Sequence, residues 1–233
     1  MHRDLVDTLG RRVVKGGVVP GETFPNEADL SAELDVSRTV IREAVKVLAS
    51  KGLVDTRPKT GTRVMPRDRW NLIDPDVLHW LFEDGGDEGL LSQLSEVRMI
   101  VEPAAAALAA RRRTEVELLG LVGLLEDMVR LTDDADAYIG ADLAFHSAIL
   151  SAAHNELLAR MAATIHEALI ASRRVTVRIP GGPSKATPHH ALVVAAIRTR
   201  NGRAASRAME RLVQATWHDV ETILHHDGGP IDR

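Results

Sequence analysis

Three side chains of metal-ligating type stand in the second half of the sequence: Asp142, His146 and His190. Asp142 and His146 are four residues apart, and in a helix this spacing turns the two side chains by only about 40° from each other. A carboxylate and an imidazole so placed can share a divalent cation, and His190 is the natural third ligand. Taken alone, this spacing is more often that of an ion pair on a helix surface or at a helix end.

The composition limits the chemistry open to these residues. The chain of 233 residues has no cysteine, so a metal would depend on histidine and carboxylate ligands. A hydrophobic content of 45% is that of a globular protein, with material for two modest domains. No apolar run approaches the roughly 20 residues of a membrane span, and the first residues lack a signal-peptide pattern. We therefore expect a cytoplasmic protein that does not enter a membrane.

A second group of chemically active side chains lies on the segment SRTVIREAVKVLASKG, residues 37–52. Ser37 is a good N-cap and Gly52 a good stop, so the segment predicts a helix bracketed at both ends. One face is apolar, and the basic and hydroxyl side chains off that face are Arg38, Thr39, Arg42 and Lys46. Arginine can donate paired hydrogen bonds to a guanine edge or clamp a phosphate. The pattern indicates a DNA-recognition helix, with an ordinary amphipathic surface helix as the alternative.

The neighbouring segments favour the DNA-binding interpretation. Upstream, Asn26 is the expected cap of a short helix, EADLSAEL, which only two residues separate from Ser37. Downstream, LVDTRPKTGTRVM has two short β-prone runs around a basic turn, which is typical of a β-hairpin. That turn contains Lys59, Gly61 and Thr62. Helix, tight turn, helix and hairpin together predict a winged helix-turn-helix domain over residues 1–68.

The formal net charge of −4 is unevenly divided along the chain. Residues 1–69 hold 13 Lys or Arg against 10 Asp or Glu, whereas the remainder holds 16 against 23. The basic balance therefore lies with the predicted helix-turn-helix. Such a division is expected when one domain meets a polyanion and the other has a different task.

Long helical patterns dominate the rest of the chain, and strand signals nearly vanish. A linker with a short docking helix, residues 69–88, leads into six or seven helical segments over residues 89–228. Thr114 opens one of them with an expected capping box. Thr187 and Pro188 are the expected cap and first-turn proline of another, after a Pro- and Gly-rich loop. The fold class is mainly α: an N-terminal winged helix-turn-helix domain and a C-terminal all-α antiparallel helical bundle.

The N-terminal segment resembles the DNA-binding domain of GntR-family transcription regulators. The likeness lies in a PG turn, a proline before the second helix, the pattern SRTxxREAxxxLxxKGLV and a wing with a glycine. By that resemblance Arg38, Thr39 and Arg42 fall on operator-contacting positions, and the wing from Lys59 to Thr62 falls on a minor-groove or backbone contact. Many members carry arginine where this chain has Ala28, which puts one contact made by relatives in doubt.

The helical segments resemble the FCD ligand-sensing domain of the FadR subfamily within that family. The segments EVRMIVEPAAAALAARR, ADLAFHSAIL and HHALVVAAIRTRNGRAASRAM look like its signature, and RDRWNLIDPDVLHWL is similar to a subgroup that represses galactonate and related sugar-acid operons. The resemblance implies that Asp142, His146 and His190 are three of four ligands of a divalent metal, zinc first, with nickel or manganese as alternatives. Leu212 takes the place of the fourth ligand, usually a histidine, which leaves coordination positions open.

The resemblance also implies that Arg98 projects toward the same cavity, where a guanidinium can hold a carboxylate through two bonds, with Arg174 as a second candidate. We therefore expect a homodimeric, ligand-responsive repressor that binds a palindromic double-stranded DNA operator and is released by a sugar acid or similar small carboxylate. Two alternatives remain: a metal-dependent hydrolase at the same His and Asp residues, or a regulator with an apolar or acyl effector and no metal. The sequence has neither HExxH nor a nucleophile elbow, so we expect no enzyme.

Overall fold

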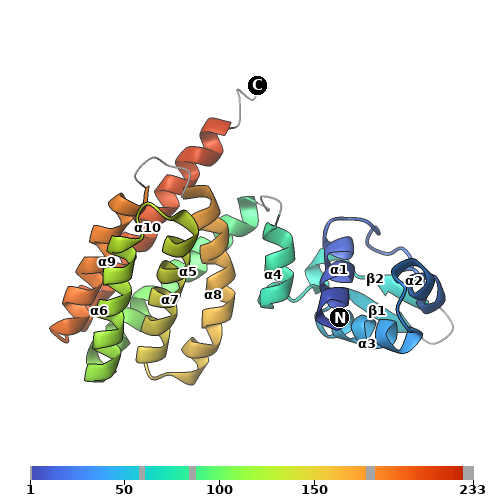
Figure 1. The fold of residues 1–233 in the computed structure, drawn as a ribbon, viewed down its shortest axis with the longest axis horizontal. Helices are drawn as coiled ribbons and strands as arrows, with labels where there is room; N and C mark the ends of the chain where they lie inside the picture. Colours follow the sequence, from blue (N-terminus) through green and yellow to red (C-terminus); the bar gives the residue numbers. More distant parts are fainter. Residues whose placement is uncertain (1, 58–60, 84–87, 177–181, 228–233) are drawn as a thin grey trace. The chain divides into compact units, whose positions relative to one another are not determined.

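The computed structural model describes residues 2–57, 61–83, 88–176 and 182–227, and the chain forms two compact units, 1–85 and 86–233 (Figure 1). The elements of the N-terminal unit are α1 (His2–Val14), α2 (Glu27–Leu34), α3 (Arg38–Ser50), β1 (Val54–Arg57), β2 (Gly61–Val64), the short 3-10 helix η1 (Arg67–Arg69) and α4 (Pro75–Phe82). The elements of the C-terminal unit are α5 (Glu88–Arg112), α6 (Glu115–Arg130), α7 (Ala135–Ala152), α8 (Glu156–Thr176), α9 (Gly182–Arg198) and α10 (Gly202–Asp227). Among the described helices, none is long and apolar enough to cross a membrane.

The predicted recognition helix is confirmed as α3. The Ser37 hydroxyl accepts a hydrogen bond from the Val40 amide at 3.4 Å, and Gly52, just past the helix end, has a left-handed φ of 76°. Ile41, Ala44 and Leu48 are completely buried in a core that α3 shares with α1 and α2. The apolar stripe thus fixes the helix in the unit and leaves its polar face outside.

The predicted wing is also confirmed. Strands β1 and β2 pair antiparallel in a register that runs from Val54 opposite Val64 to Arg57 opposite Gly61. The segment before α2 joins them, because the Phe24 amide donates to the Thr62 carbonyl at 2.8 Å. The wing therefore packs against the same core as the recognition helix.

The short helix α4 belongs to the N-terminal unit. Trp80 is buried against α1, and its indole N–H donates to Asp7 at 3.2 Å. A Cβ at Gly10 would lie only 2.4 Å from the Trp80 ring, so this close approach requires a glycine. Lys51, just past the end of α3, donates to both oxygens of Asp74, the N-cap of α4, at 2.8 Å. An ion pair and an indole together fix α4 on the helix-turn-helix.

The C-terminal unit is an all-α bundle whose helices stand side by side in Figure 1. Helix α5 packs against α7, α8, α9 and α10, and successive helices such as α6 and α7 or α9 and α10 pack antiparallel. The capping box at Thr114 is confirmed, with both of its reciprocal bonds to Glu117 present. Helix α5 continues through Pro103, which is buried. In this bundle the central apolar cluster surrounds the candidate site.

One predicted boundary is wrong. Helix α9 begins at Gly182, so Thr187 and Pro188 lie inside it and do not form its cap and first turn. The Thr187 hydroxyl instead donates back to the Pro183 carbonyl at 2.8 Å. Two prolines in this segment, Pro183 and Pro188, could each stand in the first turn of a helix. The helix begins just before Pro183, because a residue in the first turn needs no backbone N–H for the helix.

Candidate functional site

The candidate metal ligands are core residues of the bundle. On α7 the buried residues recur at helical spacing, and Asp142 and His146 both stand on that stripe between Tyr138 and Ile149. Their exposed fractions are 0% and 1%, and that of His190 on α9 is 0%. The alternative of a surface or capping ion pair is therefore wrong. Acidic and imidazole groups at fully buried positions need partners.

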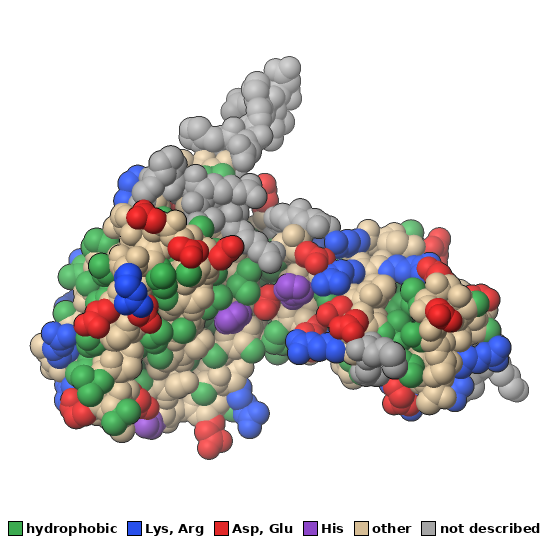
Figure 2. All heavy atoms as spheres, viewed as in Figure 1, with side chains coloured by type: hydrophobic (Ala, Val, Ile, Leu, Met, Phe, Trp, Pro, Cys, Tyr) green, Lys and Arg blue, Asp and Glu red, His purple; other side chains and the backbone are tan. Residues whose placement is uncertain are grey.

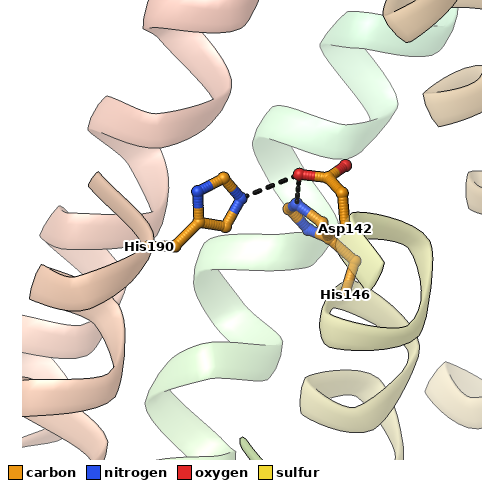
Figure 3. A group of neighbouring side chains, drawn as sticks. All are labelled: Asp142, His146 and His190. Atoms are coloured by element: carbon orange, nitrogen blue, oxygen red, sulfur yellow. Dashed lines mark ion pairs between the residues drawn. The ribbon is translucent and has the colours of Figure 1, made fainter. Parts of the chain in front are cut away.

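The three side chains converge from two helices, as Figure 3 shows. The Oδ1 atom of Asp142 lies 2.9 Å from Nε2 of His190 and 4.0 Å from Nε2 of His146. Ligand atoms around a tetrahedral zinc ion with bonds of about 2.0–2.1 Å stand roughly 3.3 Å apart. The two distances bracket that value, so a small closing movement of His146 would complete three corners of such a site.

The second nitrogen of each imidazole is already engaged. Nδ1 of His146 donates to a Glu102 carboxylate oxygen at 2.5 Å, and Nδ1 of His190 donates to the Ala186 carbonyl at 3.0 Å. The proton therefore sits on Nδ1, and burial lowers the pKa of His190 below 6.5, so its ring is neutral at neutral pH. Within the described residues, Nε2 of His146 is buried without a hydrogen-bond partner, and Nε2 of His190 meets only the Asp142 carboxylate, at 2.9 Å. Histidines held at one nitrogen and free at the other are what a metal site requires.

Arg98 lies behind this group on α5. Its Nε donates to Glu102 at 2.6 Å, so Arg98, Glu102 and His146 form a buried chain. Burial raises the pKa of Glu102, but the charge of Arg98 and the hydrogen bonds from Arg98 and His146 outweigh it and bring that pKa to about 2. One Arg98 nitrogen, Nη2, is buried and makes no hydrogen bond with any described residue. A buried guanidinium with a spare donor can bind an anionic ligand.

The sequence missed a second arginine in the network. Arg173 on α8 donates to both carboxylate oxygens of Asp142, at 2.8 Å each, and to the Thr216 hydroxyl at 3.2 Å. Burial opposes ionisation of Asp142, but the Arg173 charge dominates and holds its pKa well below the usual value. The predicted candidate was the neighbouring Arg174, whose side chain lies outside the described part of the chain. Only the packing of α8 against α7 reveals that Arg173 faces inward.

Leu212 on α10 is buried in the apolar cluster and supplies no ligand atom. Its carbonyl accepts a hydrogen bond from Thr216, the residue that contacts Arg173. His218, farther along α10, is exposed and lines a separate groove against α5. Neither residue joins the cluster of Asp142, His146 and His190.

A small cavity of about 10 Å³ lies beside Arg173. Its other lining residues come from α7, α8, α9 and α10 and include Tyr138, Thr176, Pro183, Ala186 and Asp219. Such a volume is room for one water molecule. Arg98 does not line this cavity; it approaches the candidate ligands through Glu102 and His146. A larger ligand must therefore displace side chains to reach the metal-ligand cluster.

The predicted DNA-contacting residues gather on one face of the N-terminal unit. A groove of about 510 Å³ runs between α3 and the wing, lined by Arg42, Lys46, Gly61 and Thr62 of the predicted set. Asn26, Glu27, Thr56 and Arg57 line it too and were not among the predicted DNA contacts. Arg38 and Thr39 are exposed on the first turn of α3, while Lys59 lies outside the described residues. The groove joins the two elements that a winged helix uses on DNA.

Arg42 forms an ion pair on this face. Its Nε and Nη2 donate to the two Glu27 carboxylate oxygens at 2.9 and 2.7 Å, and this pairing raises the pKa of Arg42 and lowers that of Glu27. Lys46 pairs with Glu43 at 2.7 Å. Arg42 and Lys46 of the recognition helix are therefore each paired with an acid on the same surface.

Comparison with known proteins shows the family to which the chain belongs. The family model described as "Bacterial regulatory proteins, gntR family" matches residues 2–64, and the FCD domain model matches residues 93–215. Among solved structures, Lar, titled as controlling the agr system of Listeria monocytogenes, superposes with a TM-score of 0.67 at 20% identity, over 96% of this chain and 97% of that one. At that identity the structural match shows the fold alone.

Two curated relatives cover nearly the whole chain. It is 35% identical to the galactonate operon transcriptional repressor of Escherichia coli (strain K12), over 94% of this chain and 96% of the relative. It is 30% identical to the HTH-type transcriptional regulator LutR of Bacillus subtilis (strain 168), over 91% and 95%. These names are those of regulators and not of enzymes, so the metal-dependent hydrolase considered above is excluded. The chain belongs to the GntR family of bacterial transcription regulators and carries an FCD domain.

Proposed function

We propose that this regulator is a cytoplasmic homodimer that represses a sugar-acid catabolic operon from a palindromic operator and is released by a small carboxylate. In this proposal residues 1–68 bind DNA, residues 69–88 link the domains and provide the docking helix, and residues 89–228 bind effector and dimerise. The DNA-binding set is Arg38, Thr39, Arg42, Lys46, Lys59, Gly61 and Thr62. A palindromic site matches two copies of one helix-turn-helix related by a two-fold axis.

The observation that carries the effector assignment is a set of buried polar atoms without partners. Nε2 of His146 and Nη2 of Arg98 are buried in the bundle and make no hydrogen bond within the described residues, and Nε2 of His190 meets only the Asp142 carboxylate, at 2.9 Å. Leaving such atoms unpaired costs about 1–3 kcal/mol each, so their retention indicates a ligand. Two of the three face Asp142. This supports a divalent metal, zinc in the first place, held by Asp142, His146 and His190.

The polarity of the network supports a carboxylate effector. When bound, the cation would offer open coordination positions to carboxylate and hydroxyl oxygens. Arg98 would donate Nη2 to the acid, while Glu102 keeps the guanidinium in position through its Nε bond. An apolar or acyl effector would leave these donors unpaired, so the buried charges disfavour that alternative. The name of the galactonate operon repressor supports a sugar acid as the class of ligand.

Isothermal titration tests this proposal. D-galactonate, D-gluconate, lactate and a medium-chain fatty acid are titrated into zinc-loaded and chelator-treated protein. A hydroxy acid should bind the loaded protein, and binding should weaken in His146→Ala and in Arg98→Gln. Arg207→Gln, an exposed arginine on α10, is the matched control. Preference for the fatty acid, or hydroxy-acid binding that His146→Ala leaves unchanged, would contradict the assignment.

A further inference from the structure

The groove between α3 and the wing has hydrogen-bond donors on two facing walls. Arg42 and Lys46 stand about one helical turn apart on the α3 wall. On the wing wall, Thr56 of β1 lies opposite Thr62 of β2 in the strand register, so both side chains project from the same face of the hairpin. The volume of about 510 Å³ is many times the roughly 30 Å³ share of one water molecule in the liquid. The groove can therefore hold part of a large ligand.

The charges around this groove favour an anion. Glu27 is the acid among the described lining residues, and both of its oxygens already accept hydrogen bonds from Arg42. Lys46 donates to Glu43 at 2.7 Å, but an ammonium group has two further hydrogens to donate. The two threonines of the wing wall are exposed or partly exposed, and their hydroxyls can donate as well. Three donors from two elements can therefore meet one negatively charged group.

We infer that the groove binds the backbone of one operator strand, with a phosphodiester held between Lys46 and the hydroxyls of Thr56 and Thr62. This inference rests on the proposed function and adds to it: Thr56 becomes a DNA-contacting residue, and the groove is assigned a phosphate. Lysine and threonine side chains are common donors to phosphate oxygens, and such contacts fix the position of a protein on the duplex without reading its sequence. Hydroxyls bind either kind of base edge, so they discriminate poorly between bases.

The geometry of α3 supports this position for the strand. In a helix-turn-helix the N-terminal residues of the recognition helix contact base edges in the major groove. Lys46 lies beyond Arg38 by about 12 Å along the helix axis, and so stands past that base-reading part. A sugar–phosphate strand separates the major groove from the minor groove, so it passes between a helix in one and a wing at the other. Gly61, at the rim of the groove, has a left-handed φ of 79°, and the absence of a side chain there lets a strand come close.

The experiment measures binding of the full chain to two duplexes by fluorescence anisotropy at several salt concentrations: the operator that wild type selects from random DNA, and a scrambled duplex. Thr56→Val removes the hydroxyl but keeps a side chain of similar shape with a high strand propensity. It should weaken binding to both duplexes by the same factor, about 2- to 10-fold, the value of one hydrogen bond. The salt dependence should stay unchanged, because no charge is lost. Thr56→Ser, which keeps the hydroxyl, and Thr8→Val, an exposed threonine on α1, should bind like wild type.

A second measurement locates the phosphate. Operator duplexes that carry one uncharged methylphosphonate at successive positions are compared between wild type, Thr56→Val and Lys46→Gln. At one position the modification should weaken binding by wild type more than by either variant, because each variant has already lost a partner of that phosphate. Lys46→Gln should also lower the slope of log affinity against log salt by about 1, as expected for one lost phosphate contact.

Each result decides the inference. Unchanged affinity of Thr56→Val for both duplexes would overturn it, and so would methylphosphonate penalties that are the same in wild type and Thr56→Val at every position. A loss confined to the operator would show that Thr56 contacts a base, which overturns the phosphate assignment but leaves the proposed DNA-binding function intact. If wild type selects no duplex from random DNA, the proposed function fails together with the inference. If Thr56→Val does not fold, Thr56→Ala replaces it, and affinity equal to that of Thr56→Ser overturns the inference.

Discussion

Arg42 and Glu27 form a two-bond pair in the groove between α3 and the wing, with side-chain exposures of 59% and 38%. A guanidinium held by a carboxylate loses little further freedom when it meets a guanine edge, because its plane is already set. The acid also places a negative charge where the phosphate backbone must approach. The pair is thus suited to a base contact more than to a general phosphate contact.

Arg42→Ala should weaken specific operator binding by about 1–3 kcal/mol, the range for an arginine that contacts a base. The reason is loss of a bidentate donor that no neighbour replaces. Fluorescence anisotropy with operator and scrambled DNA at one salt concentration measures the change. Equal operator affinity for Arg42→Ala and wild type would remove Arg42 from the interface.

Glu27→Gln should change specificity in another way. Without the negative charge, binding to scrambled DNA should become tighter, since repulsion from phosphates is relieved. Discrimination between operator and scrambled DNA should fall, because the Arg42 guanidinium is no longer held by an ionised partner. The ratio of the two affinities is the readout, with Glu33→Gln, an exposed acid on α2, as control. An unchanged ratio would show that Glu27 has no part in recognition.

At the scale of elements, local signals were sufficient where caps and periodicity agree. Ser37 and the apolar stripe located α3, and Thr114 located the start of α6. Local signals were insufficient where two rules compete, as at the two prolines of α9. They were also insufficient for Arg173, because consecutive helical residues differ by about 100° and only the packing of α8 on α7 selects which one faces Asp142.

The metal-ligand cluster shows the same limit. Asp142 and His146 could be paired from their spacing, but His190 comes from another helix, and its proximity depends on the bundle. The partners Glu102 and Ala186 were not identified, since a second layer of contacts has no spacing rule across helices. A signal was present all the same: Asp142 and His146 stand on the apolar stripe of α7, where a solvated pair would not.

Docking of α4 should be sensitive to alkali. Burial lowers the pKa of Lys51, but its pairs with Asp74 and Asp76 dominate and raise that pKa above 10.5. The stability from these pairs is therefore complete below 10.5 and is lost as the pH rises through the folded-state value. Tryptophan fluorescence and urea unfolding between pH about 9 and 12 should report loss of the Trp80 environment. Lys51→Met should lack this component, and an identical alkaline profile in that variant would contradict the assignment.

At the scale of the whole molecule, the two compact units carry separate tasks. The basic balance lies in the N-terminal part, and the C-terminal unit contains the cluster of Asp142, His146 and His190 and its own apolar core. Hydrophobic side chains are also visible on the surface of the C-terminal unit in Figure 2, and Val116, Leu119 and Leu192 are more than half exposed. Exposed apolar surface of this kind suits contact with a second subunit.

A fragment of residues 86–233 should therefore fold alone, remain helical and form a dimer. It should bind the same metal and effector as the full chain but have no affinity for operator DNA. Circular dichroism and analytical ultracentrifugation provide the measurements. If the fragment is monomeric, the dimer contact lies in the N-terminal unit. If it is unfolded, the bundle depends on that unit for its stability.

The most direct test of the account is the effect of a sugar acid on a preformed operator complex. D-galactonate and related hydroxy acids are titrated into zinc-loaded protein bound to fluorescent operator DNA, and anisotropy follows release. We predict that one of them releases wild type in the concentration range at which it binds, whereas Arg98→Gln binds operator normally but is not released. A complex that none of the acids dissociates, or that dissociates equally in wild type and Arg98→Gln, would contradict the account.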